Sequence, residues 1–487
     1  MITFLICVAI LVIGYFTYGR VVNKIVGPDD SIPTPANRMA DGVDYQILPW
    51  WKVLLTQFLN IAGLGPIFGA ILGAMFGPVA FLWITFGTLL VGGVHDVLSG
   101  YVSLKHNGMS ISELVGFYLG KNARTVMRIF SFVLLMLVAV VFTLAPADWL
   151  QSRMPLGTAD SSLIWMLILM GYFILATILP INALISKIFP LLSASMIFMA
   201  VLLLIGVFIG VFNGTVQMVE FTFNFPHAGG LSPFPFLFIT IACGAVSGFH
   251  ATKSPMMARC LKKESETQRV FYGAMVIEGI VALVWAAAAM AVLGDRFLLG
   301  ETVGAMGGPG GVVNSLSDYL LGGWGIILVI IAIIIVPVTS ADTTFRSIRL
   351  LISDAFKINQ TSLKSRLIVS IPIFAIAFAI SFVDFDVIWR YFAWSNQTLA
   401  AMALWTGAAF LATNKKFHWI ASLPAAFMSF VSISYILQAP DEGFGLPAGI
   451  SNTAGIIAAL VLFILFIFVP HKQRIGTDGV ATKSTAN

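Results

Sequence analysis

The stretch FLFITIACGAVSGFHATKSPMMARCLKKE, residues 236–264, begins as an apolar membrane helix and is then interrupted by glycine, serine, histidine, lysine and proline. Interruptions free backbone groups from the helical ladder, and at bilayer depth this is tolerated only where protein or a water-lined cavity receives those groups. A second interrupted stretch, LLTQFLNIAGLGPIFGAILGAMFG, occupies residues 54–77. Paired interrupted helices in corresponding halves of a chain are typical of secondary transporters. The alternative is that the glycines only allow close helix packing through small-residue contacts.

The composition is that of a polytopic membrane protein. Of 487 residues, 59% are hydrophobic and 10% are charged, against roughly 25% charged residues in soluble domains. The net charge of +5 comes from Lys and Arg in loops between apolar runs, so a lipid bilayer is the expected partner and nucleic acid is not. The three cysteines have no CxxC spacing, so neither a disulfide framework nor a cysteine zinc site is indicated.

Apolar stretches of about 20 residues, the length that crosses a bilayer, predict thirteen membrane spans. Loops rich in Lys and Arg alternate with loops nearly free of them, and the positive-inside rule places the basic loops in the cytoplasm. We therefore expect the C-terminus in the cytoplasm and, because the span count is odd, the N-terminus outside. The predicted spans lie near 2–24, 52–77, 78–103, 124–147, 162–181, 186–213, 233–258, 268–294, 322–346, 366–383, 388–411, 417–438 and 452–470.

The two interrupted segments become the first and sixth of ten core helices if the first span is set aside, and they run in opposite directions. This pattern predicts an all-α membrane protein with a LeuT-like (APC superfamily) five-plus-five inverted repeat. The expected organisation is an extra N-terminal helix at 1–25, a cytoplasmic Pro- and Asp-rich loop at 26–51, repeats at 52–213 and 233–411, two additional helices at 412–470 and a cytoplasmic tail at 471–487.

The loop after the first span carries the elements GPDD (27–30), PTPA (33–36) and DGVDY (41–45). These elements resemble those of the carbon starvation protein A family of bacterial inner-membrane transporters. The resemblance covers most of the chain. It continues through IAGLGPIFG (61–69), GGVHD (92–96), KSPMMARC (253–260), TSADT (339–343) and NQTLAAMAL (396–404).

The resemblance implies a nutrient importer of the bacterial inner membrane that serves scavenging during carbon starvation. Members of the family are associated with peptide uptake, and some relatives with proton-coupled pyruvate uptake. We therefore expect alternating-access import of short peptides, coupled to protons, with a pyruvate/H⁺ symporter as the alternative. Where a histidine pair is expected ahead of the first break, this chain has QFLN at 57–60.

Two other classes of function compete with transport. A membrane-embedded nutrient sensor would keep the same fold but would bind without accumulating its ligand. An enzyme is not expected, because GAVSG at 244–248 is not the GxSxG nucleophile elbow, GGPGG at 307–311 lacks the Gly-Lys-Ser/Thr of a phosphate loop, and HExxH does not occur. No cofactor is expected, and the oligomeric state is not indicated.

Helix N-termini at the breaks attract carboxylates through their dipoles and free N–H groups. A peptide or pyruvate carboxylate is therefore expected near 63–65 or 244–248. Lys253 either pairs with this carboxylate or is an interfacial lysine that reaches the membrane surface. The polar residues at 394–397 either line the same cavity or join helices by hydrogen bonds. The candidate substrate-binding residues are Asn60, Gly63, Gly65, Gly244, Ser247, Gly248, His250, Lys253, Trp394, Asn396 and Gln397.

Ionisable residues inside spans are costly and usually face a cavity or a partner. Glu278 is either a proton carrier or a neutral acid hydrogen-bonded between helices. His95 titrates near physiological pH when unperturbed, and Asp96 beside it is expected on a different helix face. Lys187 either stands where other LeuT-like transporters hold a sodium ion or is a lysine that extends to the membrane surface.

Sodium coupling is the alternative to proton coupling. Thr339, Ser340 and Thr343 offer hard oxygen ligands, helical spacing places Asp342 on the face of Thr339 and Thr343, and carbonyls freed near 61–63 would complete a cage. The candidate ion-coupling residues are Glu278, His95, Asp96, Lys187, Thr339, Ser340, Asp342 and Thr343. A weaker alternative is a divalent metal held by His95, Asp96, His250 and Asp342, although no HxxH-type spacing occurs.

Overall fold

The computed structural model of the chain is helical throughout its described part, which comprises residues 1–41, 45–156, 161–178, 189–221, 227, 230–294, 303–306, 308–358, 360 and 362–468. The α-helices are α1 (Ile2–Phe16), α2 (Tyr18–Val26), α3 (Pro35–Arg38), α4 (Trp50–Ile61), α5 (Ala70–Ala74), α6 (Val79–Phe86), α7 (Gly93–Lys105), α8 (Ile111–Leu119), α9 (Lys121–Arg153), α10 (Ser161–Ile178), α11 (Phe189–Phe212), α12 (Pro233–Thr240), α13 (Gly248–Ala258), α14 (Gly273–Leu293), α16 (Pro309–Leu321), α17 (Gly325–Val329), α18 (Val336–Phe356), α19 (Leu363–Ile380), α20 (Phe385–Thr413), α21 (Trp419–Gln438) and α22 (Ala448–Phe468). Short π-helical segments join several of them, namely η1 (Gly65–Gly69), η2 (Gly87–Gly92), η4 (Gln268–Tyr272) and η6 (Ile330–Ile335).

Nine helical segments within the described residues are long and apolar enough to cross a membrane, or ten if the bent pair of α4 with η1 and α5 is one span. The protein is therefore a multi-pass membrane protein, but the predicted count of thirteen spans is not confirmed. The stretch predicted at 162–181 contains only a shorter apolar helix, Ser162–Thr177. The stretch predicted at 233–258 is divided into α12 and α13, neither of which is long enough alone.

Both predicted interruptions are present. The chain bends by 62° between α4 and the helical run Gly65–Ala74. The second interruption separates α12 from α13, and residues 241–247 between them are not helical. Both interruptions contain glycine, and Pro66 follows the first, whereas His250, Lys253 and Pro255 lie inside α13 rather than in the second interruption.

The two interruptions pack against each other. A Cβ atom added to Gly65 would collide with Cβ of Cys243, and one added to Gly69 would lie 3.0 Å from the carbonyl oxygen of Thr240. The small-residue interpretation therefore also holds, because the glycines that break the helices also let the two breaks approach closely.

Side chains from the α6 region satisfy carbonyl groups that the second interruption frees. The indole Nε1 of Trp83 donates to the carbonyl of Ile241 at 3.2 Å, and the hydroxyl of Thr88 donates to the carbonyl of Gly244 at 3.1 Å. Freed backbone groups inside a membrane protein need such internal partners, since no water is present in the hydrocarbon to replace them.

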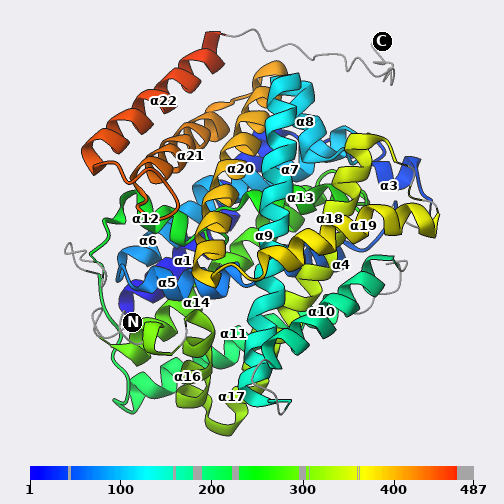
Figure 1. Ribbon diagram of the computed structural model, residues 1–487. Helices are drawn as coiled ribbons and strands as arrows, with labels where there is room; N and C mark the ends of the chain where they lie inside the picture. Colours follow the sequence, from blue (N-terminus) through cyan, green and yellow to red (C-terminus); the bar gives the residue numbers. More distant parts are fainter. Residues whose placement is uncertain are drawn as a thin grey trace, which may run out of the picture.

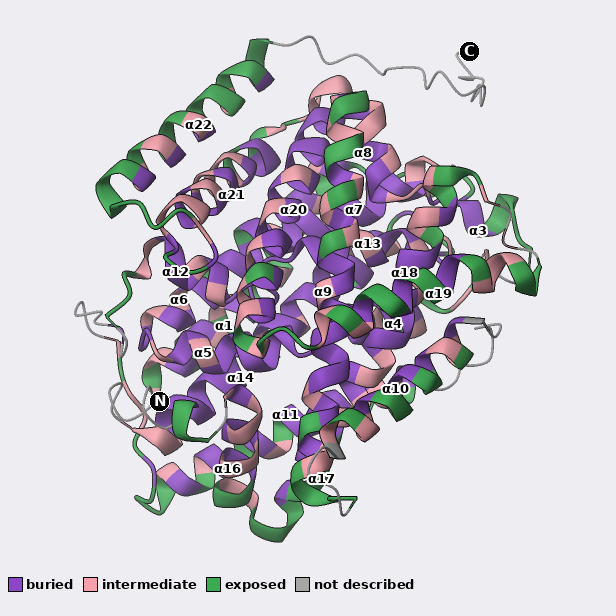
Figure 2. Ribbon diagram, in the orientation of Figure 1, coloured by how far each residue is buried: buried purple, intermediate pink, exposed green. Residues whose placement is uncertain are grey.

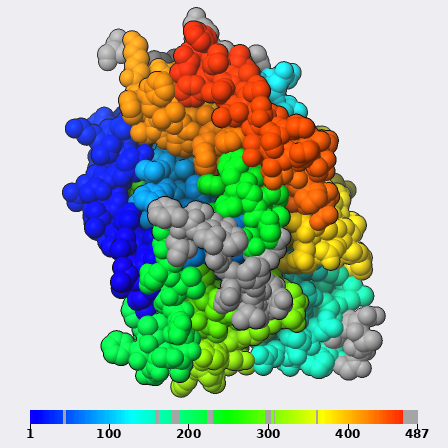
Figure 3. Space-filling view, turned by 90° about the vertical axis from the view of Figure 1, so that its left-hand side faces the viewer, coloured from blue at the N-terminus to red at the C-terminus, as the bar shows by residue number. Residues whose placement is uncertain are grey.

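The most buried helices form the middle of the bundle, and the helices at its edge are exposed (Figures 1 and 2). Helices α13, α14 and α20 are largely buried, whereas α22 and α10 present exposed apolar side chains. In Figure 3 the C-terminal helices cover one end of the molecule, and the N-terminal helices lie along one edge. Exposed apolar surface of this kind fits contact with lipid chains, which solvate it as well as protein does.

The loop between α2 and α4 is attached to the segment that follows α13. The buried carboxylate of Glu264 accepts a hydrogen bond from the backbone N–H of Asp29 at 2.9 Å and pairs with Lys105 at 2.8 Å. The hydroxyl of Thr34 donates to the carbonyl of Leu261 at 2.7 Å. Hydrogen bonds from Ser31 hold the pKa of the Asp29 carboxyl below its usual range. The GPDD and PTPA elements thus cover the basic end of α13.

Because the second interruption is closely packed, we expect one added methyl group at Gly248 to lower the stability of the protein. In Gly248→Ala the new Cβ would lie 2.5 Å from the carbonyl oxygen of Asn396 and 2.6 Å from the amide nitrogen of Ala400, both backbone atoms. Overpacking of this kind costs roughly 1–3 kcal/mol. Thermal unfolding in detergent should show a lower Tm for Gly248→Ala and no decrease for the control Gly171→Ala, whose Cβ meets nothing within 4 Å. Equal Tm values for the two variants would contradict this packing.

Candidate functional site

A cavity of about 760 Å³ lies beside the first interruption. It is at the end of α9 that carries Asp148 and Trp149, opposite the end that carries Lys121. Four parts of the chain form its main walls: the η1–α5 region, α9, α16 with the residues before it, and the start of α20. The lining comprises Phe68, Leu72, Met75, Ala145, Asp148, Trp149, Ser152, Val303, Gly304, Met306, Gly308, Pro309, Gly310, Gly311, Asn314, Ile333, Asp384, Phe385, Asp386, Trp389 and Arg390.

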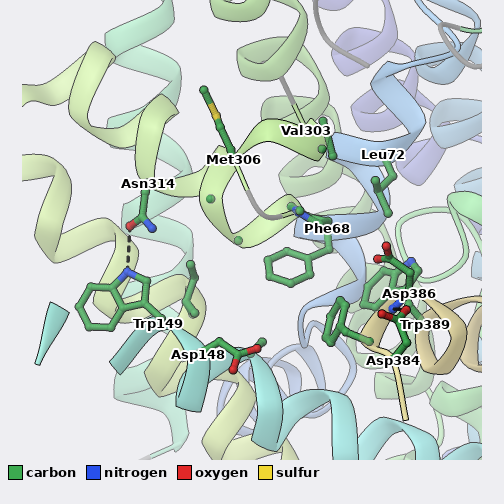
Figure 4. Close-up of a pocket in the computed structure, with 18 of the residues that line it drawn as sticks. Phe68, Leu72, Asp148, Trp149, Val303, Met306, Asn314, Asp384, Asp386 and Trp389 are labelled. Carbon is green, nitrogen blue, oxygen red and sulfur yellow. Dashed lines mark hydrogen bonds between the residues drawn. The ribbon is translucent and has the colours of Figure 1, made fainter. Parts of the chain in front are cut away.

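Aromatic rings form two walls of the cavity. Figure 4 shows Phe68 between Trp149 and Asn314 on one side and Asp384, Asp386 and Trp389 on the other. The rings of Phe68 and Trp389 are 5.7 Å apart, and the indole Nε1 of Trp149 donates to Oδ1 of Asn314 at 2.8 Å. The aromatic groups are thus held by contacts of their own.

The charged groups that line the cavity are three carboxylates and one guanidinium. Arg390 is paired with Glu442 at 3.1 Å and with Asp441 at 3.6 Å, neither of which lines the cavity. Asp384 accepts hydrogen bonds from the backbone N–H groups of Asp386 and Val387 and caps α20. Since the single cation has acidic partners outside the cavity, the lining favours positively charged groups.

The acidic cavity was not predicted from the sequence, and none of the eleven predicted substrate-binding residues lines it. Two signals pointed toward it. Asp148 lies in APADW (145–149), where Pro146 falls inside α9. Asp384 and Asp386 lie in DFD (384–386), at the start of α20. Such residues at span ends look like ordinary loop residues until the fold brings the span ends together.

Asn396 of α20 occupies the N-terminus of α13, where the sequence predicts a substrate carboxylate. Its Oδ1 accepts from the backbone N–H of Phe249 at 2.8 Å and from the hydroxyl of Ser247 at 3.1 Å. Two of its predicted neighbours join helices instead. The indole of Trp394 donates to the carbonyl of Ser432 at 3.1 Å, and Nε2 of Gln397 donates to the carbonyl of Phe238 at 3.0 Å.

Protein atoms also fill the first interruption. Asn60 is buried at the end of α4, and its Nδ2 has no hydrogen-bond partner among the described residues. A Cβ on Gly63 would collide with the ring of Phe142, and one on Gly244 would lie 2.6 Å from Cβ of Ala282. Side chains of the protein therefore pack closely against the glycines of both interruptions.

Four of the predicted residues form one buried chain across three helices, which we call the His–carboxylate chain: His95, Asp96, His250 and Glu278. The carboxylate of Asp96 is hydrogen-bonded to Nδ1 of His95 at 2.7 Å and to Nδ1 of His250 at 2.9 Å. Nε2 of His250 lies 3.3 Å from Oε2 of Glu278. All four side chains are fully shielded from solvent. His95 and Asp96 are consecutive residues of α7, and their side chains contact each other because the imidazole of His95 turns toward the carboxylate of Asp96.

The contact between His250 and Glu278 has an ion-pair distance without hydrogen-bond geometry. Within the described part of the chain, neither carboxyl oxygen of Glu278 has a hydrogen-bond partner. His250 is the polar group that the structure places beside Glu278, at the end of the His–carboxylate chain. The proton carrier and the neutral acid hydrogen-bonded between helices both stay predictions.

Lys253 is fully buried and contacts α18. Its Nζ donates to the hydroxyls of Thr343 and Thr344 at 3.2 Å each and to that of Ser347 at 3.3 Å. The interpretation of Lys253 as an interfacial lysine is wrong, because the ammonium turns into the protein. Lys253 does not line the cavity either, so it does not meet a substrate there.

The remaining residues of the proposed sodium site are placed by α18. Thr339 donates to carbonyls of its own helix, at Ile335 and Val336. The hydroxyl of Ser340 lies 3.4 Å from the carbonyl of Leu59, close to the end of α4. Only Ser340 thus reaches the first interruption. Lys187 lies outside the described residues.

The four predicted metal ligands do not form a metal site. Across the part of the chain that the structure describes, no group of three or more His, Cys, Asp or Glu side chains has an arrangement that could hold a metal ion. His95 and His250 direct their Nδ1 atoms at Asp96, and Asp342 lies on α18. The carboxylate of Asp96 therefore has the two imidazoles as its hydrogen-bond partners.

Two interrupted helices packed break to break, a buried chain of titratable groups and an adjoining cavity define a polytopic membrane protein of the transporter class. The chain belongs to the carbon starvation protein CstA family, whose family model matches residues 1–164, 153–315 and 308–435.

Named relatives agree with this assignment, and one solved structure shares the fold. The peptide transporter CstA of Bacillus subtilis is 28% identical, over 94% of each chain. The pyruvate/proton symporter BtsT of Escherichia coli is 27% identical over 57% of this chain, which spans about half (47%) of that relative. Both are named as transporters, in agreement with a chain that is not an enzyme. A manganese transporter of Eremococcus coleocola, solved with an aromatic bis-isothiourea compound, shares the fold with a TM-score of 0.51 at 14% identity, covering 88% of this chain and 98% of its own.

The cap on α13 predicts the effect of removing its acceptor. Asn396→Leu leaves the buried N–H of Phe249 without a partner, and an unsatisfied buried donor costs roughly 1–3 kcal/mol. Asn396→Asp keeps an acceptor oxygen. We expect faster amide hydrogen exchange at residues 248–250 in Asn396→Leu. The control Asn414→Leu, at the exposed end of the same helix, should leave exchange there unchanged. Unchanged exchange in Asn396→Leu would show that Asn396 is not the cap.

Proposed function

We propose that the chain is a secondary active transporter that imports short peptides across the bacterial inner membrane by alternating access, coupled to protons. The family membership and the named relatives support the transporter class. The organisation proposed with it is a LeuT-like inverted repeat of 52–213 and 233–411, with the N-terminus outside and the C-terminal tail in the cytoplasm. Its physiological setting would be nutrient scavenging during carbon starvation.

The observation that carries proton coupling is the His–carboxylate chain. His250 lies in the first turn of α13, with Asp96 on one ring nitrogen and Glu278 on the other. A protonated imidazole can donate to both carboxylates, whereas a neutral imidazole can donate to only one. A proton that binds Glu278 removes one of the two charges that hold His250. The protonation state of the His–carboxylate chain therefore changes the contacts of His250 at the start of α13, directly after the second interruption.

The cavity supports a peptide as substrate. Its volume lies within the roughly 300–1,000 Å³ of small-molecule sites, its walls are aromatic, and its unpaired charges are carboxylates. The ammonium group of a short peptide would be attracted by Asp148 or Asp386, while the side chains of the peptide would contact Phe68 and Trp389. In this proposal the cavity faces outward, because it lies opposite the basic loops. The substrate enters there before the interruptions open.

A pyruvate/H⁺ symporter is the second candidate, and the similarity to BtsT supports it. Pyruvate has a carboxylate but no ammonium group, so the acidic lining of the cavity would repel it at the point of entry. A sensor with the same fold would bind its ligand without accumulating it.

Uptake into proteoliposomes tests these candidates. Labelled di- and tripeptides and labelled pyruvate would each be supplied under an imposed pH gradient and, separately, under a sodium gradient. The proposal expects peptide accumulation driven by the pH gradient alone. Accumulation of pyruvate without accumulation of peptide would favour the pyruvate/H⁺ symporter over the peptide transporter. Binding of either ligand without accumulation would reject transport and favour a sensor.

Proton coupling predicts the behaviour of Glu278→Gln. The amide cannot bind and release a proton, so accumulation driven by a pH gradient should fall at least tenfold. Exchange of labelled for unlabelled peptide across the membrane needs no net proton movement and should be retained. Asp318→Asn, an exposed carboxylate of α16, is the matched control and should accumulate peptide like the unmodified chain. Full accumulation by Glu278→Gln would remove this residue from the proton path.

The acidic cavity predicts selectivity for a free amino terminus. Competition by a dipeptide should be at least tenfold better than by its N-acetylated form, which corresponds to about 1.4 kcal/mol. Asp148→Asn should narrow this ratio, because Asp148 is one of the three carboxylates that line the cavity. The measurement is inhibition of labelled peptide uptake by each compound. Equal inhibition by both forms in the unmodified chain would exclude ammonium recognition.

A further inference from the structure

The hydroxyl cluster that holds Lys253 is arranged to accept a cation. Each of its three hydroxyls donates its own hydrogen to a carbonyl of α18: Thr343 and Thr344 to Ser340, and Ser347 to Thr343. Their oxygen lone pairs therefore remain free to accept. The three oxygens face a single point, which the Nζ of Lys253 occupies.

A carboxylate lies next to this cluster in the chain. Asp342 directly precedes Thr343 on α18. It is 5% exposed, and its Oδ1 has no hydrogen-bond partner among the residues that the structure describes. The ring of Phe249 lies 4.9 Å from Nζ on the other side. Buried ammonium groups are costly unless they are paired and hydrogen-bonded, and here three hydroxyls of α18 and the ring of Phe249 on α13 contact the ammonium.

Hydroxyl and carboxylate oxygens are also the ligands that hard monovalent cations prefer. A lysine ammonium carries the same single charge but is covalently attached to α13, so it cannot leave during a transport cycle. The cluster joins α13, which begins at the second interruption, to α18, whose Ser340 reaches the end of α4. It therefore links both interrupted segments through the side chain of Lys253.

We propose that Lys253 is a tethered cation that occupies a monovalent-cation site between α13 and α18, so that the protein works without sodium. Removal of the ammonium would turn the hydroxyls of Thr343, Thr344 and Ser347, with Asp342, into a site that sodium can enter. The transport part of this inference rests on the proposed function, whereas the binding part does not.

The binding part is tested by thermal unfolding in detergent, with sodium chloride compared with choline chloride at equal ionic strength. The unmodified chain should have the same Tm in both salts. Lys253→Ala should unfold earlier than the unmodified chain in choline and recover several degrees in sodium, with saturation as sodium is increased. The double variant Lys253→Ala with Asp342→Asn should lose the recovery. Lys121→Ala, on α9, is the control without a buried ammonium and should show no difference between the salts.

Two results would overturn the inference. One is a Tm of Lys253→Ala that is equal in sodium and choline, and the other is stabilisation of the unmodified chain by sodium. If Lys253→Ala does not fold, the unmodified chain still decides, because a sodium-dependent Tm or a requirement for sodium in proteoliposome uptake would exclude a tethered cation. The unfolding assay uses no substrate. Failure to accumulate peptide would thus reject the proposed function without affecting this result.

Discussion

The structure depends on how a membrane protein satisfies backbone groups that two broken helices leave free. Each broken helix gives up part of its internal ladder at a depth where water is absent, and other side chains must replace it. Trp83 and Thr88 donate hydrogen bonds to carbonyls of the second break, and Asn396 accepts one from an N–H group at the start of α13. These partners come from helices far apart in the sequence. The breaks are thus stable only as part of the assembled bundle. To open them, the freed backbone groups must exchange their present hydrogen-bond partners for others.

The charges buried around α13 follow the same logic. His250 and Lys253 are separated by one turn of this helix, yet they contact different partners: His250 contacts carboxylates of α7 and α14, and Lys253 contacts hydroxyls of α18. One side of α13 therefore contacts carboxylates through an imidazole, and the other contacts hydroxyl groups through an ammonium. These contacts favour one position of α13, because a movement away from either set of partners would leave a charged group in a medium that cannot solvate it.

Local chemistry made the breaks predictable, since glycine, proline and polar residues that occur together in an apolar run disrupt the helical ladder wherever the chain folds. The span count was less predictable because the length of an apolar stretch does not show whether it forms one helix or two short ones, as in α12 and α13. Lys253 was misplaced for a different reason. Its position near the basic residues 262–263 indicates the membrane surface, but the loop that contains Thr34 folds over that end of α13 and covers it. The cavity was beyond sequence reasoning, because its four main walls come together only through long-range packing.

The attachment of Glu264 has a consequence for the architecture of the bundle. Asp29 belongs to the loop that precedes α4, yet its backbone supplies a hydrogen bond to a carboxylate buried in the segment after α13. A shortened protein that began at α4 would leave this carboxylate to Lys105 and Tyr101 alone. The first two helices and their loop are therefore an integral part of the bundle. A protein without α1, α2 and their loop would lose the hydrogen bonds that Asp29 and Thr34 make to the segment after α13.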